Sequence, residues 1–392
     1  MSWTSAALGD LFEIARGGSP RPIANYLTEA DDGVNWVSIS DATDSAKYIR
    51  STKRKIKPAG VSRSRVVAPG DFLLTNSMSF GRPYIMATSG CIHDGWLSLS
   101  PKTAGTDPDY LFQVLSSPYT YRKFERLASG ATVKNLNIDL VRGVEIPLPP
   151  LDEQRRIAAI LDQADALRRK RREALAFAGT LKQALLECML NHISHLESSS
   201  VLLAELVRRG DKINYGVVQP GDDFQDGVSL VRVGNIVDGD FRSGSMKQID
   251  PKIEAQYQRS RLKGDEILVA CVGSIGSVAI ASPELAGANI ARAVARIPSD
   301  PMKINREYLS EYLKSEACQR YFISETRTVA QPTLNIKQLS ETPIPLPASG
   351  DQERFSQDVA RIDALIMQSR ESLKYLDALF ASLQHRAFRG EL

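Results

Sequence analysis

The sequence predicts an α+β protein in which two tandem globular domains are each followed by a long helix. Three observations support this prediction. The string IPLPPLDEQRR at 146–156 returns in part as IPLPASGDQER at 344–354. Short β-rich runs between Gly and Pro residues precede each string, and a proline-free stretch follows each one. We expect the two helices to pack as an antiparallel coiled coil with pseudo-two-fold symmetry.

An internal repeat covers essentially the whole chain, and its period is far too long for a solenoid. The chain is therefore a duplicated pair of domains. The matching strings, first copy then second, are LGDL (8–11) with LAEL (203–206), PGDFLLT (69–75) with KGDEILV (263–269), SFGRPYI (79–85) with SIGSVAI (274–280), DYL (109–111) with EYL (307–309), and LNI (136–138) with LNI (334–336). The expected segments are a first domain at 1–145, a junction and helix at 146–194, a second domain at 195–343, and a second junction and helix at 344–392.

The repeated IPLP string marks the passage from each domain to its helix. Prolines exclude a helix at and before their own positions, so the chain is expected to arrive extended. Carboxylates follow at once, at Asp152 and Glu153 and again at Asp351 and Glu353, where the positive end of a helix dipole favours them. We therefore expect a rigid connection.

The two helical stretches, 152–193 and 351–389, carry heptad positions at matching places. The apolar members of the predicted seam are Ala164, Leu167, Ala178, Leu181, Leu185, Ile362, Leu365, Leu376, Leu379 and Leu383. A helix of this length spans roughly 60 Å, whereas the linker 195–202 reaches at most about 28 Å. The second domain must then begin at the far end of the first helix, which predicts an antiparallel return and a dumbbell.

Catalytic and metal-binding patterns are missing from the sequence. It contains no P-loop, no NPPY or DPPY string, no GxGxxG after a strand, and no clustered spacing of its four histidines or four cysteines. His93 and Asp94 are interpreted as a turn pair. We expect a non-catalytic cytoplasmic protein without a metal or cofactor of its own, without disulfides and without a membrane span.

Positive charge collects locally although the net charge is only +3. Residues 45–70 hold eight basic residues and no acid, which favours a phosphate-facing surface over an ordinary solvated loop. Thinner basic stretches occur in the second copy, and most of RRKRR at 168–172 is expected to be solvated. The SFGR and SIGS strings predict turns with positive φ that can also approach a nucleic acid. The candidate DNA-binding residues are Lys47, Tyr48, Arg50, Lys53, Arg54, Lys55, Lys57, Arg63, Arg65, Ser79, Arg82, Lys134, Arg208, Arg209, Lys212, Arg232, Arg259, Arg261, Lys263 and Ser274.

Over its full length the chain resembles the specificity (S) subunits of type I restriction–modification systems. The most specific strings are PLPPLDEQRRIAAILDQADAL (147–167) and LFASLQHRAFRGEL (379–392). The resemblance implies two target-recognition domains, each reading one half of a bipartite site in double-stranded DNA. It further implies that the paired helices set the spacing and dock two methyltransferase (M) subunits, and that restriction (R) subunits can join. S-adenosylmethionine, ATP and Mg²⁺ would then be used by those partners.

Three alternatives remain open at this point. The chain could be a fused methyltransferase, a protein-only adaptor, or a stand-alone DNA-binding regulator with the same architecture. The missing motifs argue against the first and the basic run argues against the second. One departure from the family pattern is the second junction, which reads ASGDQER rather than PLDEQRR, so the two ends are expected to grip their partners unequally.

Overall fold

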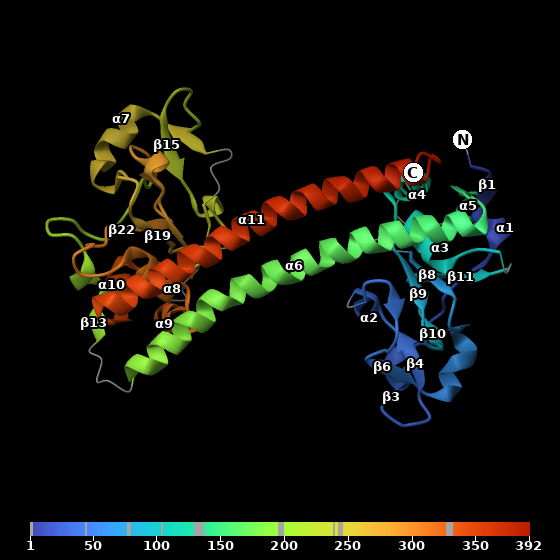
Figure 1. Cartoon of the computed structure of the whole chain (residues 1–392). Coiled ribbons are helices and arrows are strands. Elements are labelled where there is room, and N and C mark those ends of the chain that lie inside the picture. Colours follow the sequence, from blue (N-terminus) through green and yellow to red (C-terminus); the bar gives the residue numbers. More distant parts are fainter. Residues whose placement is uncertain are drawn as a thin grey trace. The chain divides into compact units, whose positions relative to one another are not determined.

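The computed structural model describes residues 3–392 except 44, 77–79, 103–104, 129–135, 137, 195–199, 238–239, 242–245 and 327–331. It forms two compact units. Unit 1 is Met1–Arg172 with Glu371–Leu392, and unit 2 is Glu173–Arg370. Each unit contains one globular part and a portion of each long helix (Figure 1). The four-segment division of the chain stays a prediction.

The globular part of unit 1 is built from short strands and helices. Its elements are β1 (Ser5–Ala7), α1 (Leu8–Leu11), β2 (Phe12–Arg16), η1 (Ile23–Asn25), β3 (Leu27–Thr28), β4 (Val34–Val37), α2 (Ile39–Thr43), β5 (Tyr48–Ile49), β6 (Arg54–Ile56), η2 (Pro58–Arg63), β7 (Arg65–Val67), β8 (Phe72–Thr75), β9 (Pro83–Met86), β10 (Gly90–Ile92), β11 (Trp96–Pro101), α3 (Pro108–Leu115), α4 (Pro118–Ala128), α5 (Ile138–Arg142) and β12 (Glu145–Pro147).

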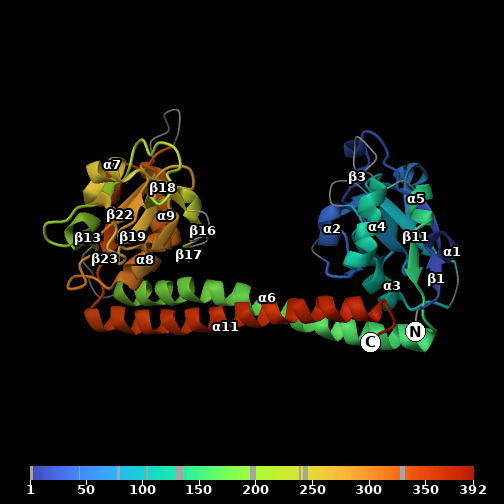
Figure 2. The same ribbon diagram turned by 90° about the horizontal axis from the view of Figure 1, so that it is seen from above.

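Two five-stranded sheets organise this part. One has the order β2-β11-β8-β9-β5 and the other β3-β6-β4-β10-β7. Apolar side chains of the first sheet form one core with those of α3, α4 and α5. The ribbons of these three helices lie beside β11 (Figure 2). A cluster around Trp96 packs the two sheets together, because it combines residues of β8, β9 and β11 with residues of β4, β7 and β10. The second sheet also has a small apolar cluster of its own around Trp36. Helices therefore cover the first sheet, while the basic strand β6 belongs to the second.

The globular part of unit 2 repeats this plan with fewer strands. Its elements are β13 (Ser200–Leu202), η3 (Leu203–Leu206), β14 (Asn214–Tyr215), β15 (Val228–Val231), η4 (Val233–Asn235), β16 (Ile236–Val237), β17 (Asp240–Phe241), β18 (Lys247–Ile249), α7 (Pro251–Glu254), η5 (Ala255–Ser260), β19 (Ile267–Ala270), β20 (Val278–Ile280), η6 (Pro283–Leu285), β21 (Asn289–Ile290), β22 (Val294–Ile297), α8 (Arg306–Lys314), α9 (Glu316–Glu325), α10 (Ile336–Ser340) and β23 (Pro343–Pro345).

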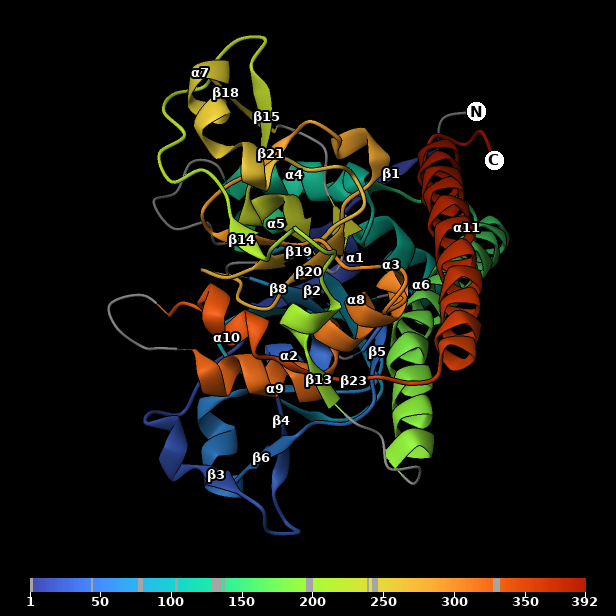
Figure 3. The ribbon, with the colours of Figure 1, turned by 90° about the vertical axis from the view of Figure 1, so that its left-hand side faces the viewer.

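Strand pairing confirms the duplication. The order β14-β22-β19-β20 matches β2-β11-β8-β9, and β18-β15-β21 matches β6-β4-β10. The equivalent pairs β4–β10 in unit 1 and β15–β21 in unit 2 are both parallel. In unit 2, α8, α9 and α10 lie in orange beside β19 and β20 (Figure 3). The α+β class and the tandem repeat predicted from the sequence are therefore confirmed.

The junction of unit 1 is held by one buried glutamine. Residues Glu145–Pro147 pair with β1 as strand β12, and helix α6 (Leu151–Ser194) begins four residues later. The side chain of Gln154, which is 1% exposed, accepts the N–H of Asp107 at 2.8 Å and donates to the carbonyl of Pro149 at 2.8 Å. Asp107 is the N-cap of α3, and Tyr110 of α3 donates its hydroxyl to the carbonyl of Pro147.

The junction of unit 2 uses the same contacts. Gln352 lies in the first turn of α11 (Ser349–Ala387); it accepts the N–H of Asn305 and donates to the carbonyl of Pro347, both at 2.8 Å. Asn305 caps α8, and the Tyr308 hydroxyl donates to the carbonyl of Pro345. The repeated string is therefore a fixed connection between a strand, a capped helix and the long helix.

Portions of α6 and α11 pack side by side and antiparallel within each unit. In unit 1, Arg156 donates to the carbonyl of Leu392, and Arg168 pairs with Asp377 at 2.6 Å. The numbering rises along one helix while it falls along the other. The guanidinium of Arg168 also lies 4.2 Å from the ring centroid of Phe380. The expected helix pair is therefore present, with a charged residue in its contact face.

The register of the seam differs from the prediction at every second position. Leu167, Leu365 and Leu379 are 54%, 59% and 51% exposed, so the structure does not place them in the seam, and Leu181 is half-buried. The positions that are buried or half-buried throughout are 164, 168, 171, 175, 178, 182, 185 and 189 in α6, and 362, 366, 369, 373, 376, 380, 383 and 387 in α11.

This difference has a physical cause. The prediction preferred Leu167 over Arg168 because leucine is apolar. However, the long stem of an arginine can cover apolar surface while its charge finds a partner, as Arg168 does with Phe380 and Asp377. The remaining expected members, Ala164, Ala178, Leu185, Ile362, Leu376 and Leu383, lie at buried or half-buried seam positions.

The junction predicts a selective loss of stability in unit 1. Replacing Gln154 with Leu leaves a buried N–H and a buried carbonyl without partners, which should lower the free energy of unfolding by about 2–4 kcal/mol. All three tryptophans, Trp3, Trp36 and Trp96, belong to unit 1, so their fluorescence during urea unfolding reports on this unit. The matched control is Gln163→Leu, because Gln163 is exposed on the same helix. Equal unfolding midpoints for both variants would contradict this role of Gln154.

Candidate nucleic-acid interface

The fold divides the basic run of residues 45–70 between two places. Lys47 and Tyr48 lie beside α3 and α6, because their side chains contact Asp109 of α3 and Asp162 of α6. The Lys47 side chain is only 15% exposed, and its ammonium lies 2.6 Å from Asp109 and 2.8 Å from Asp162. The Tyr48 hydroxyl donates to Asp109 at 2.5 Å. These interactions fix strand β5 to two helices. The geometry therefore gives Lys47 and Tyr48 a structural role, and their binding to DNA stays a prediction.

The titration behaviour of this cluster agrees with a structural role. Burial alone would raise the pKa of Asp109, but the hydrogen bonds from Lys47 and Tyr48 lower it below its ordinary value. Burial, followed by the hydrogen bond to the Asp109 carboxylate, raises the pKa of Tyr48. The carboxylate and the phenol therefore hold their charged and neutral forms near neutral pH, and the cluster is a stable internal ion pair.

The other described basic candidates of unit 1 are exposed or half-buried. Arg54 and Lys55 lie on β6, Arg63 ends η2 and Arg65 begins β7, all in or beside the second sheet. Two of these side chains are braced: Lys57 donates to the carbonyl of Asn25 at 2.9 Å, and Arg63 donates to the Tyr26 hydroxyl at 3.0 Å. The exposed candidates are Arg50, Lys53, Arg54, Lys57, Arg63, Arg65 and Arg82, and Lys55 is half-buried.

The repeated Ser-Gly strings form the hairpin turns that the sequence predicted. Gly81 between β8 and β9 has φ of 81°, and Gly276 between β19 and β20 has φ of 83°. A Cβ atom on Gly276 would lie 2.2 Å from a side-chain oxygen of Gln319, so glycine is required there for two reasons. Ser274 is exposed in its turn. Ser79 and Lys134 lie outside the described residues.

Three of the basic candidates in unit 2 have internal partners. Arg208 pairs with Asp265 at 2.7 Å, Arg261 pairs with the buried carboxylate of Glu254 at 2.5 Å, and Lys263 lies 3.7 Å from Asp211. A carboxylate at this distance competes with a phosphate for the cation. The exposed candidates that remain are Arg209, Lys212, Arg232 and Arg259.

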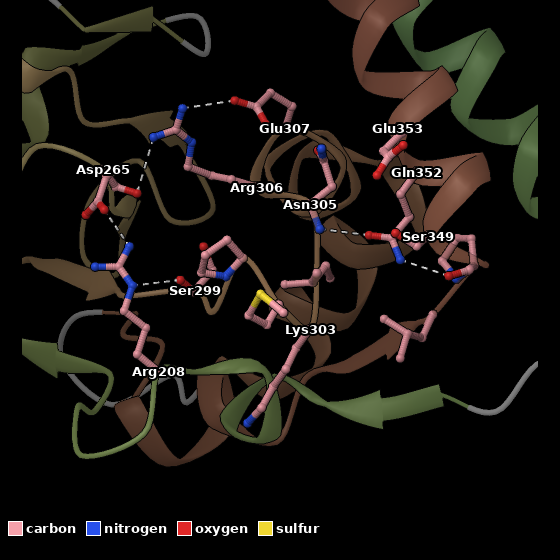
Figure 4. Close-up of a pocket in the computed structure, with 15 residues that line it drawn as sticks. Arg208, Asp265, Ser299, Lys303, Asn305, Arg306, Glu307, Ser349, Gln352 and Glu353 are labelled. Carbon is pink, nitrogen blue, oxygen red and sulfur yellow. Dashed lines mark hydrogen bonds and ion pairs between the residues drawn. The ribbon is translucent and has the colours of Figure 1, made fainter.

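Arg208 lines a cavity of about 480 Å³ beside the unit 2 junction (Figure 4). Asp265 joins the two arginines of this cavity, because its carboxylate pairs with Arg208 and its carbonyl accepts a hydrogen bond from Arg306. Gln352 and Asn305 form the opposite wall. Arg208 is therefore held by Ser299 and Asp265, and its binding to DNA stays a prediction.

The repeated GD strings have a structural function as well. The Glu266 carboxylate accepts the N–H of Lys263 at 2.9 Å and of Gly264 at 3.0 Å, and Asp71 accepts the N–H of Ala68 at the matching turn of unit 1. Glu266 is fully buried and pairs with Arg296 at 3.0 Å. Sequence reasoning missed this ion pair, because burial of both partners depends on strand pairing between β19 and β22.

Sites for other chemistry do not emerge from the described part of the chain. Within it, no group of three or more His, Cys, Asp or Glu side chains could hold a metal ion, and no helix is long and apolar enough to cross a membrane. The four cysteines are free thiols, of which only Cys188 is exposed. Burial raises the pKa of Cys271 and of Cys318 to about 12, so these two thiols are unreactive.

The class of protein is defined by two copies of one α+β domain, each with exposed basic side chains and each continued by one of two paired helices. Residues 2–176 and 208–375 both match the family described as the type I restriction modification DNA specificity domain. The chain belongs to this family and is a specificity subunit of a type I restriction–modification system.

Individual relatives agree with this assignment. The chain is 32% identical over 293 residues to the type I restriction enzyme EcoBI specificity subunit of Escherichia coli, covering 67% of this chain and 62% of that subunit. It is 22% identical over 416 residues to the MjaVIII specificity subunit of Methanocaldococcus jannaschii, covering 100% of this chain and 93% of that one.

Solved structures share the fold. A chain from work on complex assembly and conformational transition of the type I R-M system has a TM-score of 0.61 and 20% identity, and the match covers 100% of this chain and 98% of that one. The S subunit of a type I system from M. genitalium has a TM-score of 0.56 and 16% identity, with 99% and 96% coverage.

The basic run predicts a measurable change in salt dependence. Replacing Lys53, Arg54, Lys55 and Lys57 with Gln should weaken binding to every duplex and flatten its dependence on salt, by about 0.9 in logarithmic slope for each phosphate that is no longer neutralised. The measurement is duplex binding by the full chain over a series of salt concentrations. The control removes four other cations, at Lys170, Arg320, Lys337 and Arg354, all exposed and outside the run. If both variants show the same salt slope, the basic run contributes no more to DNA binding than any other surface charge.

Proposed function

We propose that this specificity subunit reads a bipartite site in double-stranded DNA, with residues 1–145 reading one half and 195–343 the other. The observation that carries the proposal is the duplication itself. The family match falls on both copies, and each copy presents its own set of exposed cations. Phosphate contacts from such cations position a protein on DNA, and base contacts then supply the sequence preference.

The paired helices α6 and α11 are proposed to dock two methyltransferase subunits, one on each unit. In unit 1 they expose Leu167, Tyr375 and Leu379, which are 54%, 68% and 51% accessible. The matching positions of the repeat in unit 2 are Leu365, Phe177 and Leu181, of which the first two are 59% and 66% accessible. Exposed apolar side chains at equivalent places on two units suit two copies of one partner.

The chemistry of the system is assigned to its partners. We propose that this chain catalyses no reaction, that methyltransferase subunits modify adenine with S-adenosylmethionine, and that restriction subunits use ATP and Mg²⁺. The relatives named as type I restriction enzyme specificity subunits support this division. A cytoplasmic location follows from a DNA substrate and from four free thiols.

Modular reading predicts the result of a domain exchange. Replacing residues 1–145 with the same region of a relative should change one half of the methylated site and leave the other half unchanged, because each recognition unit has its own core. The measurement is sequencing of modified adenines in cells that carry the exchanged chain, the native chain or neither. If the native chain produces no modification, the proposed function fails. If both halves change together, the two domains do not read independently.

The duplicated apolar positions predict the stoichiometry of the complex. Leu167→Ser with Leu379→Ser should remove one methyltransferase subunit from the purified complex, and Leu365→Ser with Leu181→Ser should remove the other. Native mass spectrometry measures the composition directly. The control is Met367→Ser, because Met367 is 70% exposed and its repeat counterpart is Arg169. A complex that keeps two methyltransferases in the fourfold variant would contradict this docking surface. A native chain that co-purifies with none would instead favour a stand-alone regulator.

A further inference from the structure

An open concavity in the second sheet of unit 1 has the character of a site that reads a base. Its volume is about 720 Å³, and its floor and walls include Pro20, Pro22 and Trp36. Arg54 of the basic run lies at its edge, together with Arg21, whose side chain is 79% exposed. Sequence reasoning identified only Arg54 of these residues. The concavity therefore joins apolar walls to two accessible cations.

One polar side chain in this concavity is held in a fixed orientation. The His93 ring lies 6.1 Å from the rings of both Trp36 and Trp96, and its Nδ1 accepts the N–H of Gly95 at 2.9 Å. A Cβ atom on Gly95 would lie 2.5 Å from the ring, so this arrangement requires glycine. Asp94 is occupied separately, because its carboxylate accepts hydrogen bonds from Ser19 and Arg21. His93 is thus more than the turn residue that the sequence suggested.

The hydrogen bond to Nδ1 decides what His93 can offer a ligand. A neutral imidazole whose Nδ1 is an acceptor carries its proton on Nε2. Burial lowers the pKa of His93 and outweighs the nearby Asp94 carboxylate, so the ring is neutral at pH 7. Among the described residues none accepts a hydrogen bond from Nε2. His93, which lines the concavity, therefore carries one neutral donor on a ring held in a fixed orientation.

The second copy supports a role in specificity. Strand pairing aligns Trp36 beside Cys91 in unit 1 with Leu230 beside Asn289 in unit 2. By the same alignment His93 corresponds to Ala291 and Asp94 to Arg292. One backbone hydrogen bond beside these positions occurs in both units. The N–H of Gly18 donates to the carbonyl of Ile92, and the N–H of Val217 donates to the carbonyl of Ile290. The scaffold is therefore retained while the side chains at this place diverge, as expected where two copies read different sequences.

We propose that His93 is a specificity-determining residue of the first half-site, donating through Nε2 to an acceptor on a base edge, such as a purine N7, a guanine O6 or a thymine O4. Arg54 then contacts a neighbouring phosphate. A phosphate oxygen could accept the same hydrogen bond, but phosphates are mainly neutralised by cations, whereas His93 is neutral and recessed between aromatic rings. This assignment rests on the proposed function and names the side chain that carries part of it.

The test is selection of duplexes from a random DNA library by the full chain, purified with the subunits that accompany it. His93→Ala should lower the preference at one or two adjacent positions of a single half-site by about tenfold, the value of one good hydrogen bond to a base. The salt slope should stay unchanged, whereas Arg54→Gln should lower it by about 0.9. His385→Ala, on the exposed face of α11, is the control and should select the native sequence.

Two further variants separate recognition from packing, because the Ala variant also removes a ring from between two tryptophans. His93→Phe keeps a ring without the donor and should lose the preference. His93→Gln keeps an N–H donor and should retain part of it. If the Phe variant selects the native sequence, or if all variants weaken binding equally at every position, the assignment is overturned. If the native chain itself selects no sequence, the proposed function fails first.

Discussion

The interaction on which the rest of the structure depends is the buried glutamine at the start of each long helix. One side chain satisfies the N–H of the residue that caps a domain helix and a carbonyl of the proline run that leads out of the domain. A glutamine has both a donor and an acceptor at its tip, so it can serve both groups, and few other residues could. The long helix consequently leaves its domain at a fixed place, and whatever docks on the helix is positioned relative to that domain.

This constraint explains why the same junction string occurs twice. A surface loop with prolines tolerates substitution, but a strand, a capped helix and a long helix that meet at one side chain do not. The hydroxyls of Tyr110 and Tyr308 complete the arrangement by donating to prolines of the same run. The differences between the copies, PLDEQRR and ASGDQER, fall around the glutamine and leave its hydrogen bonds unchanged.

The sequence predicted the elements well because repetition supplied independent evidence for each one. It failed where a choice depended on tertiary partners. Lys47 was indistinguishable from its neighbours in the basic run until Asp109 and Asp162 were seen beside it. In the sequence His93 is only a turn residue, because its hydrogen bond from Gly95 and its contacts with Trp36 and Trp96 appear only in the fold. Composition locates charge, whereas only the fold shows which charges are already paired.

Charged residues in the seam of the helix pair also have specific tertiary partners, which an entirely apolar seam would lack. Arg168 meets Phe380 and Asp377 in unit 1, and Lys182 pairs with Asp363 in unit 2. The repeat counterpart of Arg168 in α11 is Ile366, so α6 brings a cation where α11 brings an aliphatic side chain. The counterpart of Asp377 in α6 is Gly179, so an antiparallel pair of two α6 helices would take this carboxylate away from Arg168 and place Lys182 near it, which is unfavourable. Lys182 itself would still face Asp165, the counterpart of Asp363. The polar positions thus favour the pairing of α6 with α11 inside one chain over association between copies.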